Sequence, residues 1–532
     1  MHRMKWILIT SIGLLSCNSP LREDMHPSTQ IIPEPQEITV QDQVFKLSAK
    51  TSIVADEDLA LPAKQLKAYL SPATGFPFMI NGSKSGGNVI ELKLDSKLSS
   101  LGEEGYKISS SPRKIEISAY HSSGIFYGIQ TIRQILPVEI ENTKESEVRR
   151  SWEIPCVSIT DIPRFKWRGL MLDCSRTFWD KNYIKRTIGL MSLYKMNILH
   201  LHLTDDQGWR IEIDKYPELT LKGARFPEKW NEPKEREGYY TKADIKEIVE
   251  YAGQHCITVV PEIELPGHTF EVLACYPDLS CTGGPFEIHP FFEGPGIHED
   301  ILCAGNDNTF EFLENVFTEV FELFPSEFIH IGGDEAPKAR WEVCPKCQQR
   351  IREEGLLDEH ELQSWFVKRI EKFANSKGKK IIGWDEILEG GLSSTANVMY
   401  WRGWLEDVPE KVTSKGNNII MSPTTHCYFD YKYEDISTLK AYSFEPVPEG
   451  LNSEQTENVL GVQANFWSHI DRTEEGVDRQ LYPRLLSIAE VAWSPAGGKD
   501  SIYFKRKVNA HLLRLEELGV NYFPDPELIE IQ

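Results

Sequence analysis

The sequence predicts an α/β protein in which a (β/α)8 TIM barrel is preceded by a small α+β domain. Three observations support this prediction. The first part alternates short apolar runs with turns, whereas the rest contains eight nearly continuous apolar segments, most of them separated by helical patterns. Polar and aromatic residues gather directly after those segments, where the loops of a barrel build its active site. The length of 532 residues suffices for both domains.

The N-terminus has the pattern of an export signal. His2, Arg3 and Lys5 precede an apolar stretch at residues 6–15, which is too short to span a bilayer. The stretch ends in LLSC, which resembles a bacterial lipobox with Cys17 as the lipidated residue. We therefore expect a lipoprotein signal peptide at residues 1–17 and a tether at 18–30. The alternative is an ordinary cleaved signal with an incidental cysteine.

This signal predicts an exported protein of the periplasm or outer membrane that touches the membrane only through its lipid anchor. No other segment is apolar over the length needed to cross a bilayer. With 58 basic and 80 acidic residues, the net charge of −22 disfavours nucleic acid as a partner. Nothing in the sequence predicts the oligomeric state.

Residues 31–154 are predicted to form the α+β domain. Residues 89–94 and 114–119 alternate as strands do, and residues 60–70 form a helical stretch. Residues 124–136 form a second helical stretch, because their apolar residues recur at helical spacing. A charged segment at 139–150 then marks the domain boundary near residue 155.

Residues 155–500 are predicted to form the barrel, and residues 501–532 a C-terminal helix and tail that pack on it. Apolar strands that alternate with helices are typical of a parallel barrel, whose strands are buried on both faces. The eight expected strands are 169–172, 198–203, 258–263, 328–331, 380–384, 397–401, 418–421 and 461–466.

The cysteines allow either bridges or free thiols. Export permits disulfides, and Cys281 with Cys303, which flank a loop rich in Gly and Pro, is the expected pair. Cys344 and Cys347 have the spacing of half a zinc ribbon, but no second CxxC and no nearby His pair completes four ligands. We expect local bridging or free thiols there, and no metal.

Carboxylates, Arg, His and Trp side chains follow the expected strands, which predicts one polar site at the mouth of the barrel. Taken singly, each has a structural explanation, such as a helix N-cap for Asp205 or a buried pair for Arg176 with Asp173. The set comprises Asp173, Ser175, Arg176, Asp205, Asp206, Glu262, Glu264, His268, Asp334, Glu335, Trp384, Asp385, Trp401, Arg402, His426, Tyr428, Asp430, Trp467 and His469.

The adjacent carboxylates Asp334 and Glu335 are the expected catalytic pair. Gly332 and Gly333 before them suit a tight exit from the strand. Like charges this close favour one protonated partner, which could act as a general acid in glycoside cleavage. Neighbouring residues cannot easily sit on opposite sides of a glycosidic bond, so another group has to supply the nucleophile.

Three motifs carry a resemblance to a known family: HLHLTDDQGWR at 200–210, PEIELPGH at 261–268 and HIGGDE at 330–335. With EGY at 104–106 and FYGIQT at 126–131, the chain resembles glycoside hydrolase family 20, the β-N-acetylhexosaminidases, over roughly residues 31–500. The resemblance implies an exo-acting, retaining enzyme without a cofactor. It would release terminal non-reducing β-linked GlcNAc or GalNAc from N-acetylhexosamine-terminated glycans or chito-oligosaccharides. The 2-acetamido oxygen of the substrate would be the nucleophile, through an oxazolinium-type intermediate.

The resemblance also implies residue roles. Glu335 would be the acid and base, and Asp334 would accept the acetamido N–H and stabilise positive charge. Asp205, His268 and Glu264 would position the acid. The expected substrate-binding residues are Arg176 for the 3- and 4-hydroxyls, Tyr428 for the acetamido oxygen, Asp430 for a hydroxyl, the ring walls Trp365, Trp384 and Trp467, and His469.

The sequence departs from the family pattern at two positions. Many members carry Asp at the position of Glu264, a change that conserves charge. The family often places Glu at the position of His469, where it contacts the 4- or 6-hydroxyl, so the choice between gluco- and galacto-configured sugars stays open.

Two alternatives remain at this point. His200 and His202 on one strand could bind a metal in a metal-dependent barrel hydrolase. Apolar Leu201 and Leu203 would then face the opposite side, which a purely structural strand also requires. The second alternative is a non-catalytic sugar-binding lipoprotein.

Overall fold

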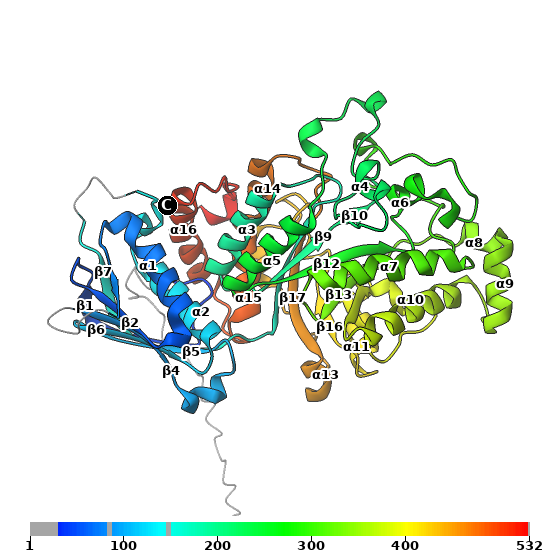
Figure 1. Cartoon of the computed structure of the whole chain (residues 1–532). Coiled ribbons are helices and arrows are strands. Elements are labelled where there is room, and N and C mark those ends of the chain that lie inside the picture. The colour runs from blue at the N-terminus through cyan, green and yellow to red at the C-terminus, as the bar shows by residue number, and fades with distance from the viewer. Residues whose placement is uncertain (1–29, 82–87, 145–149, 530–532) are drawn as a thin grey trace, which may run out of the picture.

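The computed structural model describes residues 30–81, 88–144 and 150–529, which form an N-terminal sheet domain and a closed barrel (Figure 1). The predicted signal peptide, Cys17 and all of the predicted tether except Gln30 lie outside these residues. Within the described ranges, no helix combines the length and the apolar character that a membrane crossing requires.

The N-terminal domain is a mixed seven-stranded sheet with two helices packed on it. Strand alternation explains its core: in β5 the side chains of Tyr106, Ile108 and Ser110 are buried and those between them are exposed. The sheet order is β1 (Glu37–Lys46), β7 (Glu153–Asp161), β5 (Tyr106–Ser111), β6 (Lys114–Ala119), β4 (Val89–Leu94), β2 (Ser52–Ala55) and β3 (Met79–Ile80), and the helices are α1 (Ala60–Thr74) and α2 (Ser122–Ile135).

The boundary between the domains lies after Asp161, so the predicted boundary at residues 154 and 155 is wrong. Strand β7 follows the charged segment, yet it pairs antiparallel with both β1 and β5. From the sequence, an apolar strand that follows a charged segment can be either the last strand of one domain or the first strand of the next. The pairing of the strand in the structure decides between these two possibilities.

Eight parallel strands close the barrel, and the predicted (β/α)8 architecture is confirmed. Each predicted strand corresponds to one of them, with ends that differ by a few residues. The strands are β8 (Trp167–Asp173), β9 (Ile198–His202), β12 (Thr258–Leu265), β13 (Phe328–Gly332), β14 (Lys380–Trp384), β15 (Asn397–Tyr400), β16 (Ile419–Met421) and β17 (Val459–Phe466). A short hairpin of β10 (Thr204–Asp205) and β11 (Gly208–Trp209) follows β9.

Helices cover the outside of the barrel, and polar caps fix several of their starts. Asp180 accepts hydrogen bonds from the first turn of α3, and Thr241 forms a capping box with Asp244 at α5. Between β14 and β15 a 3-10 turn, η9 (Asp385–Leu388), takes the place of a helix. The helices after the strands are α3 (Lys181–Leu193), α4 (Glu218–Leu221), α5 (Lys242–Gln254), α6 (Phe270–Cys275), α7 (Asp307–Leu323), α8 (Ala339–Val343), α9 (Pro345–Glu354), α10 (Glu359–Ser376), α11 (Val408–Thr413), α12 (Thr438–Ser443), α13 (Ser453–Glu457), α14 (Glu474–Leu481) and α15 (Arg484–Trp493).

Strand alternation separates an outer apolar layer from a barrel interior that contains both an apolar cluster, which includes Ile198 and Val260, and a group of polar side chains. On β9, Leu199 and Leu201 join the large core between strands and helices. The intervening His200 and His202 are fully buried beside Glu262 on the neighbouring strand β12, and Nδ1 of His202 forms a hydrogen bond with its carboxylate. The interior of the barrel therefore holds a buried hydrogen-bonded network directly below the loops that follow the strands.

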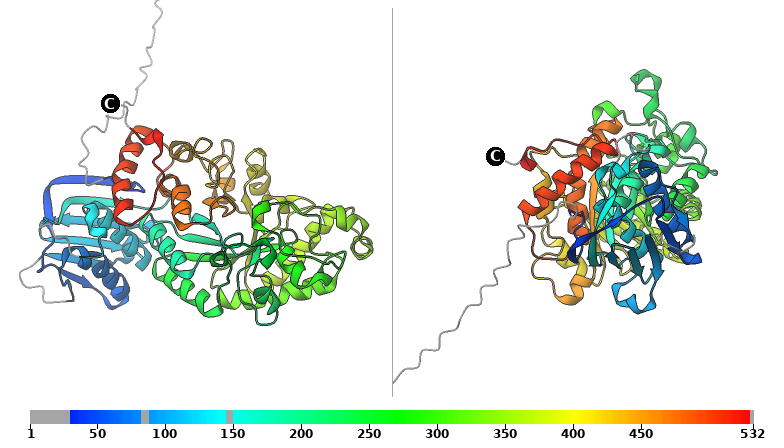
Figure 2. Two further views of the ribbon diagram at one scale, coloured as in Figure 1. Left: turned by 90° about the horizontal axis from the view of Figure 1, so that it is seen from above. Right: turned by 90° about the vertical axis from the view of Figure 1, so that its left-hand side faces the viewer.

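The last helix, α16 (Ser501–Glu517), packs against both domains (Figure 2). Arg514 binds Glu141 and the main-chain carbonyls of Gln134 and Leu136 in the N-terminal domain, while Lys507 binds Glu490 on α15. The prediction placed this helix on the barrel alone.

A buried ion pair also joins the two domains. Lys195, which follows α3 in the barrel, lies with its Nζ 2.9 Å from Asp161 Oδ2 at the end of β7. Tyr106 and Trp493 also bond to the Asp161 carboxylate, which is fully buried. Polar groups that are buried and bonded to one another in this way hold the two domains in one relative position.

Candidate active site

A cavity of about 270 Å³ opens at the end of the barrel where the strands finish. It lies where the sequence placed the polar site, and its lining combines carboxylates, one arginine and aromatic rings. The lining residues are Arg176, Asp205, His268, Pro295, Asp334, Glu335, Trp401, Thr424, Tyr428, Asp430, Tyr431, Trp467 and His469. Nine of the residues predicted to have catalytic, positioning or substrate-binding roles are among them.

The turn that carries Asp334 and Glu335 needs its two glycines. Gly332 and Gly333 have φ of +63° and +95°, and a Cβ on Gly332 would lie 1.6 Å from Glu264 Oε2. Glu335 itself has φ of +45°, a conformation that its surroundings have to stabilise. Its backbone N–H donates to Glu386 Oε2 at 2.7 Å.

Glu386 is thus a positioning residue that the sequence reasoning missed. The only available signal was its place directly after Trp384 and Asp385 at the end of a predicted strand. Burial raises its pKa to about 7.

His268 links the catalytic pair to the carboxylates behind it. Its Nδ1 lies 3.1 Å from Asp206 Oδ2 and 3.5 Å from Asp205 Oδ1, and its Nε2 lies 3.4 Å from Glu335 Oε2. Burial alone would lower the pKa of His268, but the charge of Asp205 and hydrogen bonds to Asp205 and Asp206 outweigh it and hold the pKa well above its usual range. A charged imidazolium beside Glu335 can orient that carboxyl group.

The pKa of the Asp334 carboxyl is raised in the ligand-free protein. Burial raises the pKa of its carboxyl well above the usual range, and the charges of Glu386 and Glu335 raise it further, although His268 opposes them. An N–H group that donates to Asp334, or a positive charge placed beside it, would favour the carboxylate. The residue is therefore suited to respond to a ligand that brings both.

Arg176 is fixed in place by two carboxylates. Its Nη2 lies 2.7 Å from Asp205 Oδ2 and its Nη1 3.3 Å from Asp173 Oδ2, while its guanidinium lies 4.9 Å from the centre of the Trp467 ring. Burial alone would raise the pKa of Asp205, but Arg176 and His268 outweigh it and hold the pKa well below its usual range. The guanidinium, with five donors in a rigid fork, can grip neighbouring hydroxyl groups from this position.

Several lining residues present buried polar atoms that have no hydrogen-bond partner among the described residues. These atoms are Asp334 Oδ1, Asp430 Oδ1, Trp401 Nε1, His469 Nδ1 and Arg176 Nε. Each such atom costs about 1–3 kcal/mol when it stays unpaired. A wall of donors and acceptors with apolar rings between them suits a ligand with many hydroxyl groups.

Two further lining residues have pKa values that burial shifts from their usual range. Burial raises the pKa of Asp430 to about 7. Burial and the neighbouring Arg176 lower the pKa of His469 to about 4, so its imidazole is neutral at pH 7.

The structure places Trp365 outside the site, which corrects its prediction as a wall of the pocket. Trp365 lies on the outer helix α10, edge to face with Phe310 at 5.3 Å, and the guanidinium of Arg350 covers it at 4.9 Å. Its side chain serves the packing of α10 on α7. Trp401 lines the cavity instead, stacked 6.3 Å from Tyr428.

Trp384 and Glu264 lie behind the cavity wall and not in its lining. Trp384 is 1% exposed, donates to Glu262 Oε1 at 2.9 Å and has its ring 5.9 Å from that of Trp467, so it supports the wall from below. Glu264 lies against Gly332, and its Oε1 is 3.9 Å from His202 Nδ1. Within the described residues it makes no hydrogen bond to Glu335, which corrects its assignment as a direct positioner of the acid.

The barrel histidines considered as metal ligands bind carboxylates. His200 Nε2 lies 3.1 Å from Glu262 Oε2, His330 Nδ1 lies 2.6 Å from Glu262 Oε1, and His202 Nε2 lies 2.9 Å from Asp205 Oδ2. All three rings are fully buried and none lines the cavity. This network orients Asp205, which holds Arg176 and His268 in turn, and it gives the histidines a structural role.

Comparisons with known proteins agree with this geometry. Residues 165–496 match the model of the glycosyl hydrolase family 20 catalytic domain, and residues 28–162 match that of domain 2 of the same family. A beta-hexosaminidase of Porphyromonas gingivalis is 40% identical over 535 residues, which cover 97% of this chain and 68% of that protein.

Solved structures give the same result. The beta-N-acetylhexosaminidase of Streptomyces coelicolor aligns with a TM-score of 0.83 at 30% identity, covering 94% of this chain and 99% of that one. A mutant Streptomyces plicatus beta-hexosaminidase in complex with product GlcNAc aligns with a TM-score of 0.82 at 31% identity, covering 94% of this chain and 98% of that one. The chain therefore belongs to glycosyl hydrolase family 20.

Proposed function

We propose that this β-N-acetylhexosaminidase removes single GlcNAc or GalNAc residues from the non-reducing ends of β-linked glycans, with Asp334 and Glu335 as its catalytic residues. The observation that carries the proposal is the geometry of this pair. Both carboxylates leave one turn and reach the same cavity, with His268 Nε2 3.4 Å from Glu335 and 3.9 Å from Asp334. A volume of about 270 Å³ is at the small end for a ligand pocket, which supports binding of one sugar at a time.

The family acts by substrate-assisted catalysis, and the site supplies the groups that this mechanism needs. Glu335 protonates the leaving oxygen while the acetamido oxygen attacks the anomeric carbon, and the same carboxylate then activates the water that opens the intermediate. Asp334 accepts the acetamido N–H and stabilises the positive charge of the oxazolinium ring.

The remaining lining residues would bind the sugar. Arg176 donates to the 3- and 4-hydroxyls from its fixed position, and Tyr428 donates to the acetamido oxygen. Trp401 and Trp467 bound the cavity with apolar ring faces that exclude water. Asp430 and the neutral His469 are the acceptors at the hydroxyl edge, and His469 would set the preference between GlcNAc and GalNAc.

The expected result with chromogenic substrates is turnover of both aryl β-N-acetylglucosaminide and the galactosaminide, with competitive inhibition by a thiazoline analogue of the intermediate. Product stereochemistry by NMR should show retention. Binding without turnover would favour the sugar-capture alternative, and a covalent sugar adduct on a carboxylate would contradict the mechanism. Activity should not depend on metal ions added to the assay, because the proposed reaction uses no metal.

We further propose that the chain is exported and anchored by a lipid on Cys17, on the strength of the lipobox-like LLSC sequence. Expression in a Gram-negative host should place the protein in the membrane fraction, and Cys17→Ser should move it to the soluble fraction. Recovery of the wild-type protein in the soluble fraction would contradict the anchor.

A further inference from the structure

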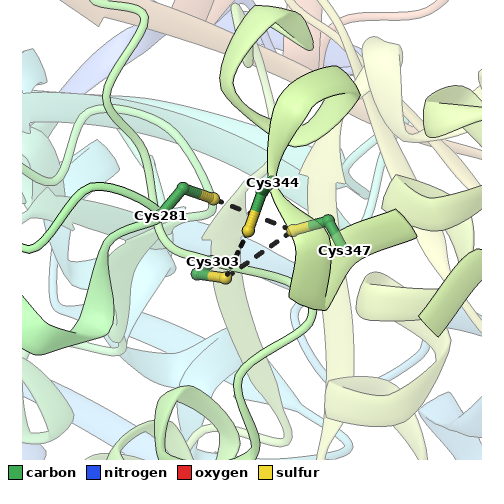
Figure 3. Close-up of side chains that lie close together, drawn as sticks. All are labelled: Cys281, Cys303, Cys344 and Cys347. Carbon is green, nitrogen blue, oxygen red and sulfur yellow. Dashed lines mark hydrogen bonds between the residues drawn. The ribbon is translucent and has the colours of Figure 1, made fainter. Parts of the chain in front are cut away.

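Four cysteine side chains from distant parts of the sequence meet in one cluster (Figure 3). Cys281 and Cys303 belong to the loop between β12 and α7, and Cys344 and Cys347 to the start of α9. The Sγ atoms lie 3.7 Å apart for Cys281 and Cys347, 3.6 Å for Cys303 and Cys347, and 3.8 Å for Cys303 and Cys344. All four lie within 4.8 Å of one another.

This arrangement contradicts the predicted disulfide, while Cys344 and Cys347 are free thiols, one of the two states expected for them. No second cysteine pair lies close in sequence to Cys344 and Cys347, but the fold brings two further cysteines from the preceding barrel loop. The expected disulfide between Cys281 and Cys303 is not formed in the structure, where the nine described cysteines are thiols. Cys303 lies close to both Cys344 and Cys347, and Cys347 lies close to Cys281 as well, so the four do not divide into two separate pairs.

The backbone around the cluster is tightly constrained. An antiparallel bridge between Ser280 and Leu302 holds the two ends of the upstream loop together, directly beside Cys281 and Cys303. A Cβ on Gly305 would lie 2.1 Å from the carbonyl carbon of Lys346, so only glycine allows this close approach of the two loops. The cluster is thus fixed from both sides.

The spacing of the sulfurs fits a tetrahedral metal site. With Zn–S bonds of about 2.3 Å, the sulfurs of a zinc site with four cysteine ligands lie about 3.8 Å apart at each edge of the tetrahedron. Three of the sulfur separations here are 3.6–3.8 Å, and all lie within 4.8 Å. A disulfide would need about 2.05 Å between two of them.

We propose that Cys281, Cys303, Cys344 and Cys347 bind one structural zinc ion. Each thiol gives up its proton on binding, so four protons are released and the Zn²⁺ with four thiolates carries a net charge of −2. Four cysteine ligands complete the tetrahedral coordination of zinc, which leaves no open position for a substrate, and three of the four are buried while Cys281 is partly buried. The ion therefore has no role in the hydrolysis and the inference does not rest on the proposed function.

The zinc would tie together the two barrel loops that carry the catalytic machinery. The loop after β12 begins with His268, and its segment between Cys281 and Cys303 contributes Pro295 to the cavity. The loop after β13 begins with Asp334 and Glu335 and leads to Cys344. Both ends of the segment between Cys281 and Cys303 would thereby be held against the loop that carries Glu335.

Metal analysis of the full chain tests the proposal directly. Protein purified without added metal or chelator should contain about one zinc per chain, and the double variant Cys344→Ser/Cys347→Ser should contain almost none and melt at a lower temperature. Cys275→Ser, at a partly buried thiol only six residues before Cys281, is the matched control and should keep its zinc.

A second measurement does not depend on the variants folding. Replacement of the metal in the wild-type chain by cobalt should give the intense absorption of tetrahedral cobalt bound to thiolates. Wild-type protein that contains no zinc would overturn the proposal. This holds both if its mass is reduced by the hydrogens lost on forming two disulfides and if its mass corresponds to four free thiols. Full zinc content in the double variant would overturn it as well. Turnover of the chromogenic substrate is a separate readout, so failure of either proposal can be recognised independently.

Discussion

Replacement of Glu335 by Gln should lower kcat by about 10²–10⁴-fold, the usual contribution of general acid and base catalysis. The amide fills the same space but can neither protonate the leaving oxygen nor take a proton from water. The loss should be smaller for an aryl glycoside with an acidic phenol, which leaves without protonation, than for a chito-oligosaccharide.

Product binding separates this loss from a folding defect. The affinity for GlcNAc, measured by calorimetry, should change only a few-fold in Glu335→Gln, because the sugar contacts of Arg176 and the tryptophans remain. Glu342→Gln on α8 makes the same charge change at an exposed position and should retain wild-type rates. Near wild-type kcat in Glu335→Gln would disprove the assignment of the acid.

Replacement of Asp334 by Asn should lower kcat by about 10²–10³-fold, the scale measured when one preorganised stabilising group is removed from a transition state. The neutral amide can still accept a hydrogen bond, but it cannot balance the positive charge of the oxazolinium ring. Affinity for the thiazoline analogue should therefore fall by a larger factor than affinity for GlcNAc.

The comparison of the two affinities makes this prediction specific to Asp334. An exposed carboxylate such as Asp407, in the segment after β15, gives the control variant Asp407→Asn, for which both affinities should stay unchanged. Equal losses for thiazoline and GlcNAc in Asp334→Asn would show a binding role alone and contradict charge stabilisation.

The sequence predicted the barrel well because parallel strands buried on both faces are continuous apolar runs, which turns and helices do not imitate over eight repeats. The polar residues after the strands followed from the same architecture. Trp365 was misplaced because an aromatic residue on a helix can face either a cavity or a neighbouring helix, and the packing of α10 against Phe310 decides that choice.

Other features depend on contacts between residues far apart in the chain. Glu386 contacts Glu335 through a backbone N–H, an interaction that leaves no residue pattern in the sequence. The cysteine cluster joins loops separated by more than 40 residues, and a search for ligands near one CxxC motif could not find it. Motif spacing therefore identifies sites built from one segment and misses those that the fold assembles.

The buried ion pair between Lys195 and Asp161 limits how either domain can be joined to a domain from another protein. A chimera that joined this N-terminal domain to a barrel with an apolar residue in place of Lys195 would leave Asp161 buried without its cation. Breaking a buried pair in this way costs about 3–5 kcal/mol, a large share of the stability of a typical domain. Engineers who exchange modules between relatives of this enzyme would have to transfer both charges together, and the same constraint would keep the two domains evolving as one unit.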